Sequence, residues 1–128
     1  MKLNAVGVST SNLKKSVQFY TILGFNFPEF KGDEDHLEPI PVEGTARLML
    51  DSEKLMKEIT GEAPKPSNHS HFAIEYDSAT EVDQVVETLK SAGYDIFKEP
   101  WDAFWGQRYA IVQDPDGRIN SSTNFMFL

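Results

Sequence analysis

The sequence predicts an α+β fold built from one structural unit that occurs twice. The chain has 128 residues, a length that suits about one domain with a substantial core. A strand-like segment, a helix-like segment and further strand-like segments follow one another before residue 61, and the same order returns after residue 70. The stretch 61–70 is rich in Pro, Ser and Asn and almost free of apolar residues. We therefore expect a single domain, 1–128, made of two modules, about 1–60 and 71–128, joined by a linker over 61–70.

The first module opens with a predicted strand and a predicted helix. Side chains over Lys2–Ser9 alternate between two faces, and this period of two is typical of a strand. Either Ser11 or Asn12 caps the helix that follows, because a short polar side chain satisfies the free N–H groups of the first turn. Gly24 is expected to end the helix in a left-handed conformation.

The rest of the first module alternates between strands and polar segments. Phe25–Phe30 alternates but contains a proline, which predicts an edge strand or a bulged strand. Lys31–Glu38 is acidic and polar and is predicted to be a turn. One or two strands are expected within 40–50, of which Ala46–Leu50 is the clearer. Asp51–Thr60 has a weak helical pattern.

The second module repeats the same order of elements. His71–Tyr76 alternates as a strand does, and Ala79–Ala92 has apolar residues at helical spacing, with Gly93 ending the helix. Three further strands are predicted over Tyr94–Lys98, Tyr109–Gln113 and Ile119–Phe127. The sequence of Asp114–Gly117, Asp-Pro-Asp-Gly, predicts a tight turn in which an Asp side chain bonds the backbone.

An aromatic-rich segment precedes this turn. It contains Trp101, Phe104, Trp105 and Tyr109, and the run before Tyr109 has neither helical nor strand periodicity. We therefore expect a loop there. Large aromatics in a loop are hard to bury, which favours contact with a ligand or with a second copy of the chain, although packing into the core is the alternative.

The overall composition excludes several classes of function. The net charge is −8, with 12 Lys and Arg against 20 Asp and Glu, which opposes binding to nucleic acid. No apolar run approaches the roughly 20 residues that span a bilayer, so we expect no membrane partner and a cytoplasmic protein. The absence of cysteine excludes disulfides and thiolate chemistry.

Two stretches point to a known family. One is Val6–Tyr20 followed by Leu23–Phe25, and the other is Gly106–Tyr109 followed by a hydrophobic strand and Asp114–Gly117. Together they resemble the glyoxalase/bleomycin resistance protein/dioxygenase family of the vicinal oxygen chelate superfamily. The resemblance implies two β-α-β-β-β modules that form a cup-shaped mixed sheet with helices on its outer face, and it implies a homodimer. Gel filtration that shows a monomer would count against a cup shared between chains.

The resemblance also bears on metal binding. In the family's metal enzymes, two His, Glu or Gln side chains from each module converge inside the cup. The matching positions here are Ala5, Met49 or Leu50, His71 and Ser121. Only His71 binds a metal well, whereas a catalytic site usually needs about three protein ligands. We therefore expect no metal and no other cofactor, and a site rearranged around His36, His69 and His71 is the alternative.

These arguments predict a metal-free protein that binds a small planar or aromatic molecule, such as an antibiotic. Some relatives of the bleomycin-binding type stack planar drugs on aromatics near this loop, as the resemblance implies. The predicted ligand-binding residues are Phe30, Met49, His71, Glu75, Trp101, Phe104, Trp105, Arg108, Tyr109 and Ser121. No catalytic residue is predicted.

Several of these residues have a second interpretation. Arg108 and Arg47 suit an anionic group on a ligand, or else surface ion pairs. Glu75 is a general base if it is buried in a pocket, or else a partner of Lys or Arg at a strand end. His71 is expected to be a neutral, hydrogen-bonded residue in the pocket wall, and coordination of a metal ion is its alternative role. Two alternatives to the predicted function are a metal-dependent lyase, isomerase or dioxygenase of glyoxalase type, and a protein-interaction or sensory domain.

Overall fold

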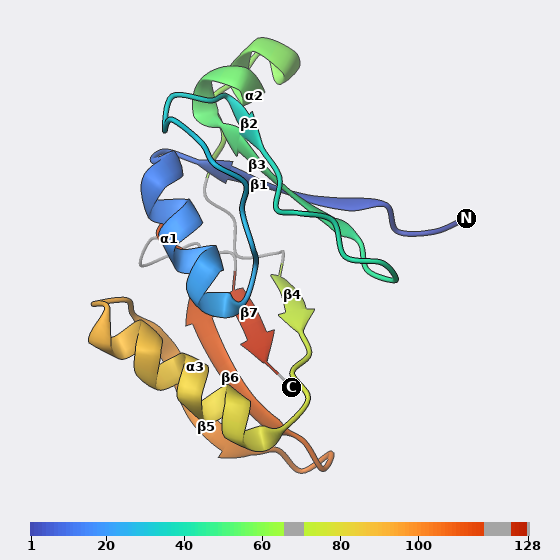
Figure 1. Cartoon of the computed structure of the whole chain (residues 1–128), viewed down its shortest axis with the longest axis vertical. Helices are drawn as coiled ribbons and strands as arrows, with labels where there is room; N and C mark the ends of the chain where they lie inside the picture. Colours follow the sequence, from blue (N-terminus) through green and yellow to red (C-terminus); the bar gives the residue numbers. More distant parts are fainter. Residues whose placement is uncertain (66–70, 117–123, 128) are drawn as a thin grey trace. The chain divides into compact units, whose positions relative to one another are not determined.

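The computed structural model describes residues 1–65, 71–116 and 124–127 (Figure 1). The chain forms two compact units, unit 1 (Met1–Lys65) and unit 2 (Pro66–Leu128). Each unit combines helix with a mixed sheet, which confirms the α+β fold class. No helix among the described residues is long and apolar enough to cross a bilayer.

Unit 1 contains a sheet of three strands and two helices. In chain order its elements are β1 (Ala5–Thr10), α1 (Leu13–Leu23), β2 (His36–Leu37), β3 (Arg47–Ser52) and α2 (Glu53–Thr60). The central strand β3 runs parallel to β1 and antiparallel to β2. Val8 and Leu50 are partners across this sheet and both are buried, so the core of unit 1 lies on their side of the sheet.

The helix α1 begins and ends where its sequence predicts. The Asn12 side chain accepts a hydrogen bond from the Lys15 backbone N–H at 3.1 Å, so Asn12 rather than Ser11 is the cap. Gly24 ends the helix with φ of 116°, a conformation that a side chain would strain. Val17 and Tyr20 lie on the buried side of α1, and their burial stabilises the helix more than its intrinsic propensity does.

Three predictions for unit 1 need correction. The strand expected over Phe25–Phe30 is absent, and Pro28 within it has no N–H to give to a sheet. The polar turn expected over Lys31–Glu38 contains the short strand β2, which pairs with β3. The first strand was expected from Lys2 but starts at Ala5, because its partner β3 begins at Arg47, opposite Ala5. Strand pairing sets these boundaries, and local alternation does not reveal it.

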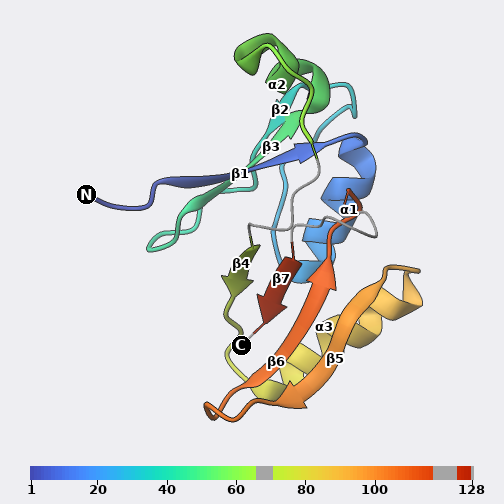
Figure 2. The ribbon, with the colours of Figure 1, turned by 180° about the vertical axis from the view of Figure 1, so that it is seen from behind.

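Unit 2 contains a sheet of four strands and one helix in its described residues. In chain order its elements are β4 (His71–Ile74), α3 (Ala79–Ser91), β5 (Ile96–Asp102), β6 (Arg108–Gln113) and β7 (Asn124–Phe127). The sheet order is β4-β7-β6-β5, with β4 parallel to β7 and the other neighbours antiparallel. Figures 1 and 2 show α3 lying across one face of β5 and β6.

The strand β5 is longer than its sequence pattern predicts. It was expected to end at Lys98 but continues to Asp102, so Trp101 lies in a strand and not in a loop. Its pairing with β6 shifts register on both sides of Lys98, and such bulges break the period of two on which the prediction depended. Part of the last predicted strand, 119–123, lies outside the described residues.

Alternation along the strands assigns the side chains to two faces of each sheet. In unit 2, Ala110 and Val112 are fully buried, whereas the alternating positions Tyr109 and Ile111 are only partly buried. Since β5 and β6 contact α3, the buried positions face the helix. Trp101 pairs with Tyr109 and therefore shares the face opposite α3.

Candidate functional site

The aromatic side chains predicted from the sequence meet in unit 2. The ring centroids of Trp101 and Tyr109 lie 5.7 Å apart, and those of Trp105 and Tyr109 lie 4.9 Å apart. Trp101 and Trp105 are nearly perpendicular at 6.2 Å, and Phe104 meets Trp105 edge to face at 4.8 Å. Such edge-to-face pairs stabilise one another beyond the area they bury. We call these four side chains, Trp101, Phe104, Trp105 and Tyr109, the aromatic cluster.

The hairpin between β5 and β6 determines how much of the aromatic cluster is exposed. The Ala103 N–H donates to the Gln107 carbonyl at 2.8 Å, and the Gly106 N–H donates to the Ala103 carbonyl at 2.9 Å. Gly106 has φ of 92°, which closes the turn without strain. Phe104 is 97% exposed and Trp105 is 47% exposed at this turn. The hairpin therefore presents aromatic surface to solvent from a hydrogen-bonded backbone.

A lysine that was not predicted as a site residue completes this region. The Lys98 Nζ lies 3.8 Å from the centroid of the Trp101 ring, which is the geometry of a cation–π contact. Lys98 lies in the bulged part of β5, where the expected alternation fails. The sequence signal for this contact was a Lys three residues before a Trp. In a regular strand this spacing does not bring the two side chains together, whereas the bulge does.

Arg108 is held by carboxylates rather than left free. Its Nε lies 3.0 Å from Asp83 on α3, and its Nη1 lies 3.2 Å from Asp102. The hydrogen bond to Asp83, and to a smaller extent the one to Asp102, raises the pKa of Arg108 above its ordinary value. The ion-pair interpretation therefore describes the side chain in this structure, and its role toward a ligand stays a prediction.

The other predicted ligand-binding residues lie in unit 1, at the start or end of β4, or outside the described part of the chain. Phe30 is half-buried in an irregular segment of unit 1, and Met49 lies on β3. Glu75 is exposed just after β4. His71 begins β4, but its side chain is outside the described residues, as are His69 and Ser121. That these residues share a site stays a prediction.

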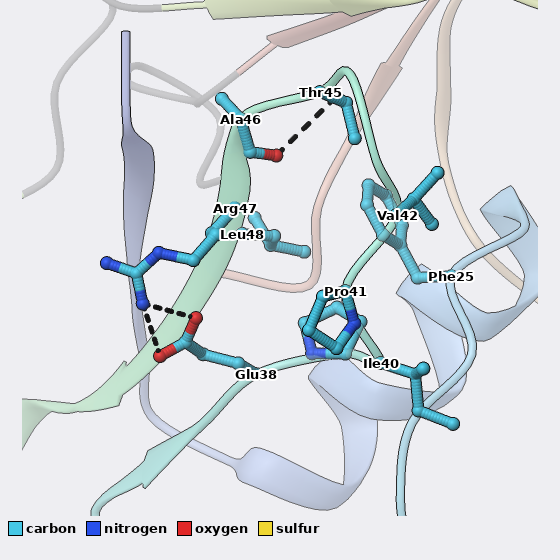
Figure 3. Close-up of a pocket in the computed structure, with 10 residues that line it drawn as sticks. Phe25, Glu38, Ile40, Pro41, Val42, Thr45, Ala46, Arg47 and Leu48 are labelled. Atoms are coloured by element: carbon cyan, nitrogen blue, oxygen red, sulfur yellow. Dashed lines mark hydrogen bonds and ion pairs between the residues drawn. The ribbon is translucent and has the colours of Figure 1, made fainter.

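A second polar group, centred on His36, lies in unit 1. The His36 Nδ1 is 2.6 Å from an Asp51 carboxylate oxygen, and its Nε2 is 2.8 Å from a Glu38 carboxylate oxygen. Glu38 also accepts two bonds from the Arg47 Nη1, at 2.7 and 2.9 Å (Figure 3). His36 and Asp51 are cross-strand partners on β2 and β3. We call these four side chains the His36 network.

The His36 network favours the imidazolium form of its histidine. An ionised carboxylate only accepts hydrogen bonds, so both ring nitrogens must carry protons to make the two contacts. The bond to Asp51 and then the bond to Glu38 raise the pKa of His36 above its usual 6.5. The bond from His36, together with the Arg47 charge, lowers the pKa of Glu38 below its usual 4.5.

These pKa shifts predict how stability depends on pH. The contribution of His36 is full below about pH 6.5 and is lost as pH rises through its raised folded pKa, because deprotonation removes a donor. The contribution of Glu38 is present above about pH 4.5 and is lost as pH falls through its lowered folded pKa. The free energies of unfolding of wild type and His36→Gln, measured with urea, should differ most between about pH 4.5 and pH 6.5. The difference is expected to be at most about 1 kcal/mol, since the His36 side chain is 44% exposed. Parallel stability profiles for the two proteins would contradict this prediction.

The residues of unit 1 do not fit the divalent metal of the family's enzymes. Of the matched positions, Ala5 has no donor atom, Met49 offers only a thioether, and Leu50 is buried in the core. The two nitrogens of His36 contact different carboxylates, so these three groups do not converge on one point. Among the described residues no group of three His, Asp or Glu is arranged to hold a metal ion.

An apolar pocket of unit 1 is too small for a drug-sized molecule. Figure 3 shows its lining, which includes Phe25, Ile40, Pro41 and Val42. Its volume is about 50 Å³, whereas pockets for small organic ligands are about 300–1,000 Å³. The aromatic cluster of unit 2 is therefore the stronger candidate for ligand binding.

Comparisons with known proteins agree with this fold. Residues 2–120 match the model of the Glyoxalase/Bleomycin resistance protein/Dioxygenase superfamily. The structure is similar to hypothetical protein SA1046 from S. aureus, with 24% identity, a TM-score of 0.77, and 99% of this chain and 91% of that chain covered. It is similar to a glyoxalase-related enzyme from Fulvimarina pelagi, with 19% identity, a TM-score of 0.77, and 99% and 88% covered.

A third similar structure is lactoylglutathione lyase from Agrobacterium tumefaciens, with 13% identity, a TM-score of 0.67, and 98% and 91% covered. At these identities the similarity concerns the fold. A comparison with curated proteins gave no match. The family match covers most of the chain. Among the described strands, the first of each unit runs parallel to the last. The chain therefore belongs to the glyoxalase/bleomycin resistance protein/dioxygenase superfamily.

Proposed function

We propose that this protein binds a small planar or aromatic molecule on the aromatic cluster, without a bound metal ion. The exposure of Phe104 and Trp105 beside two further rings is the observation that supports the proposal. Binding of a flat apolar ligand to exposed aromatic surface is favourable, because it removes apolar surface of both partners from water. Sequestration of a planar antibiotic is one physiological form of this function.

The rival functions make different demands on the chain. A lyase, isomerase or dioxygenase of glyoxalase type needs metal ligands from both modules, and Ala5 and Met49 in unit 1 do not supply them. An interaction domain would use the same exposed Phe104 against a protein surface. Direct binding of a small molecule separates the proposed function from that of an interaction domain.

Replacing Trp105 with alanine is expected to weaken binding of an uncharged planar probe, such as 2-naphthol, by about tenfold or more. The reason is that the ring provides exposed stacking surface and is in contact with the other three rings of the cluster. Isothermal titration calorimetry measures the affinity without depending on tryptophan fluorescence. In wild type, fluorescence provides a second signal, because both tryptophans of the chain lie in the aromatic cluster.

Ile59→Ala is the matched control, since Ile59 is 68% exposed on α2 and lies outside the aromatic cluster. This variant should bind the probe as wild type does. Equal loss of affinity in both variants would show that the probe adsorbs to exposed apolar residues in general. A probe that wild type does not bind at millimolar concentration would contradict the proposed function.

A further inference from the structure

Lys98 brings a positive charge onto the aromatic cluster from within the chain. Its Nζ lies 3.8 Å from the centroid of the Trp101 ring. No ion pair of Lys98 occurs among the residues that the structure describes, whereas Lys90 is bound to Glu99 at 2.6 Å. Lys98 is exposed to solvent. Among the described residues, the partner of this ammonium group is therefore the ring face and not a carboxylate.

Two neighbouring aromatic rings pack against the Trp101 ring. Tyr109 is its cross-strand partner, tilted at 45°, and Trp105 meets it at 88°. Both neighbours pack against the Trp101 indole and restrict its orientation, while one face receives Lys98. A tryptophan face is the strongest of the aromatic faces for attracting a cation.

We propose that this Trp101 face is a subsite for an ammonium group of the ligand, most suitably a quaternary ammonium, and that Lys98 fills it until the ligand displaces it. This inference rests on the proposed function, because it names the chemical class of ligand for the same aromatic cluster. A quaternary ammonium donates no hydrogen bond, so a ring face is a fitting partner for it. The net charge of −8 also attracts cations to the protein.

The test compares two ligands of the same shape that differ in charge. One is 3-hydroxyphenyltrimethylammonium and the other is 3-tert-butylphenol, used slightly below neutral pH, where both phenols are protonated. The chain has two tryptophans, so its ¹H–¹⁵N spectrum has two indole N–H signals. Titration of the ¹⁵N-labelled protein with each ligand follows both indoles and gives both affinities.

We expect wild type to bind the cation more tightly than the neutral ligand. Lys98→Met keeps most of the length of the side chain and removes the charged internal competitor, so it should tighten binding of the cation by about two- to fivefold. Trp101→Leu should remove most of the preference for the cation and leave only the part that comes from the net charge of the protein. Lys54→Met is the control, since Lys54 is an exposed lysine of α2 and the variant has the same net charge as Lys98→Met. It should keep the wild-type preference between the two ligands.

The outcomes separate this inference from the function on which it rests. Equal affinity for both ligands would overturn the cation subsite and leave the binding of aromatic molecules intact. A Lys98→Met variant that binds the cation no more tightly than Lys54→Met does would also overturn it, and this result does not depend on the folding of Trp101→Leu. If neither ligand shifts an indole signal at millimolar concentration, both the subsite and the proposed function are wrong.

Discussion

Replacing Leu50 with alanine is expected to lower the free energy of unfolding by about 2–5 kcal/mol. Leu50 is fully buried in β3, the central strand of unit 1, with Val8 and Leu37 as its neighbours across the sheet. Truncation removes buried methyl groups and leaves a cavity that strands on both sides keep from collapsing. Urea denaturation followed by far-ultraviolet circular dichroism measures the change.

Leu3→Ala is the matched control for this prediction. It makes the same chemical change at a residue that is 74% exposed, and a surface substitution of this kind usually changes stability by no more than about 0.5 kcal/mol. Similar losses in the two variants would mean that Leu50 is not part of a packed core. That result would contradict the arrangement of unit 1 around β3.

Replacing Tyr109 with alanine is expected to lower the free energy of unfolding by about 1–3 kcal/mol. The ring of Tyr109 contacts both Trp101 and Trp105, and aromatic pairs of this kind each contribute about 0.5–1.5 kcal/mol. The loss should also free both indoles to reorient. Urea denaturation measures the stability, and near-ultraviolet circular dichroism measures the order of the tryptophans.

Tyr109→Phe keeps the ring and removes only the hydroxyl, so it separates packing from hydrogen bonding. We expect its stability to stay within about 0.5 kcal/mol of wild type and its near-ultraviolet spectrum to be unchanged. A Tyr109→Phe variant as unstable as Tyr109→Ala would show that the hydroxyl, and not the stacked ring, stabilises the hairpin.

Much of the secondary structure was predictable because its signals are local. Asn12 begins the first helix and Gly24 ends it, each through hydrogen bonds to backbone groups within a few residues. Such hydrogen bonds depend little on the rest of the chain. The turn at Asp114 is of the same kind, since its side chain accepts the Asp116 N–H at 3.0 Å. These elements were assigned correctly.

The errors occurred where strands needed partners. Phe25–Phe30 alternates as a strand does, yet no strand forms there. His36 and Leu37 lie in a stretch predicted to be a turn, yet they pair with β3. Alternation indicates which side chains share a face, but only pairing with another segment makes a strand, and the partner lies outside the window in which alternation is measured.

The sequence by itself determined the family, the strand and helix that open each unit, and the aromatic residues of the hairpin, because these depend on residue type and on contacts between near neighbours. Only the tertiary structure decided that Lys98 lies over Trp101 and that His36 lies between Asp51 and Glu38. The first arrangement arises within β5, where bulges in its pairing with β6 change which of its side chains meet. The second arises where β2 and β3 are in register, so that His36 lies opposite Asp51. The charge placed on the aromatic cluster is therefore a property of the folded sheet.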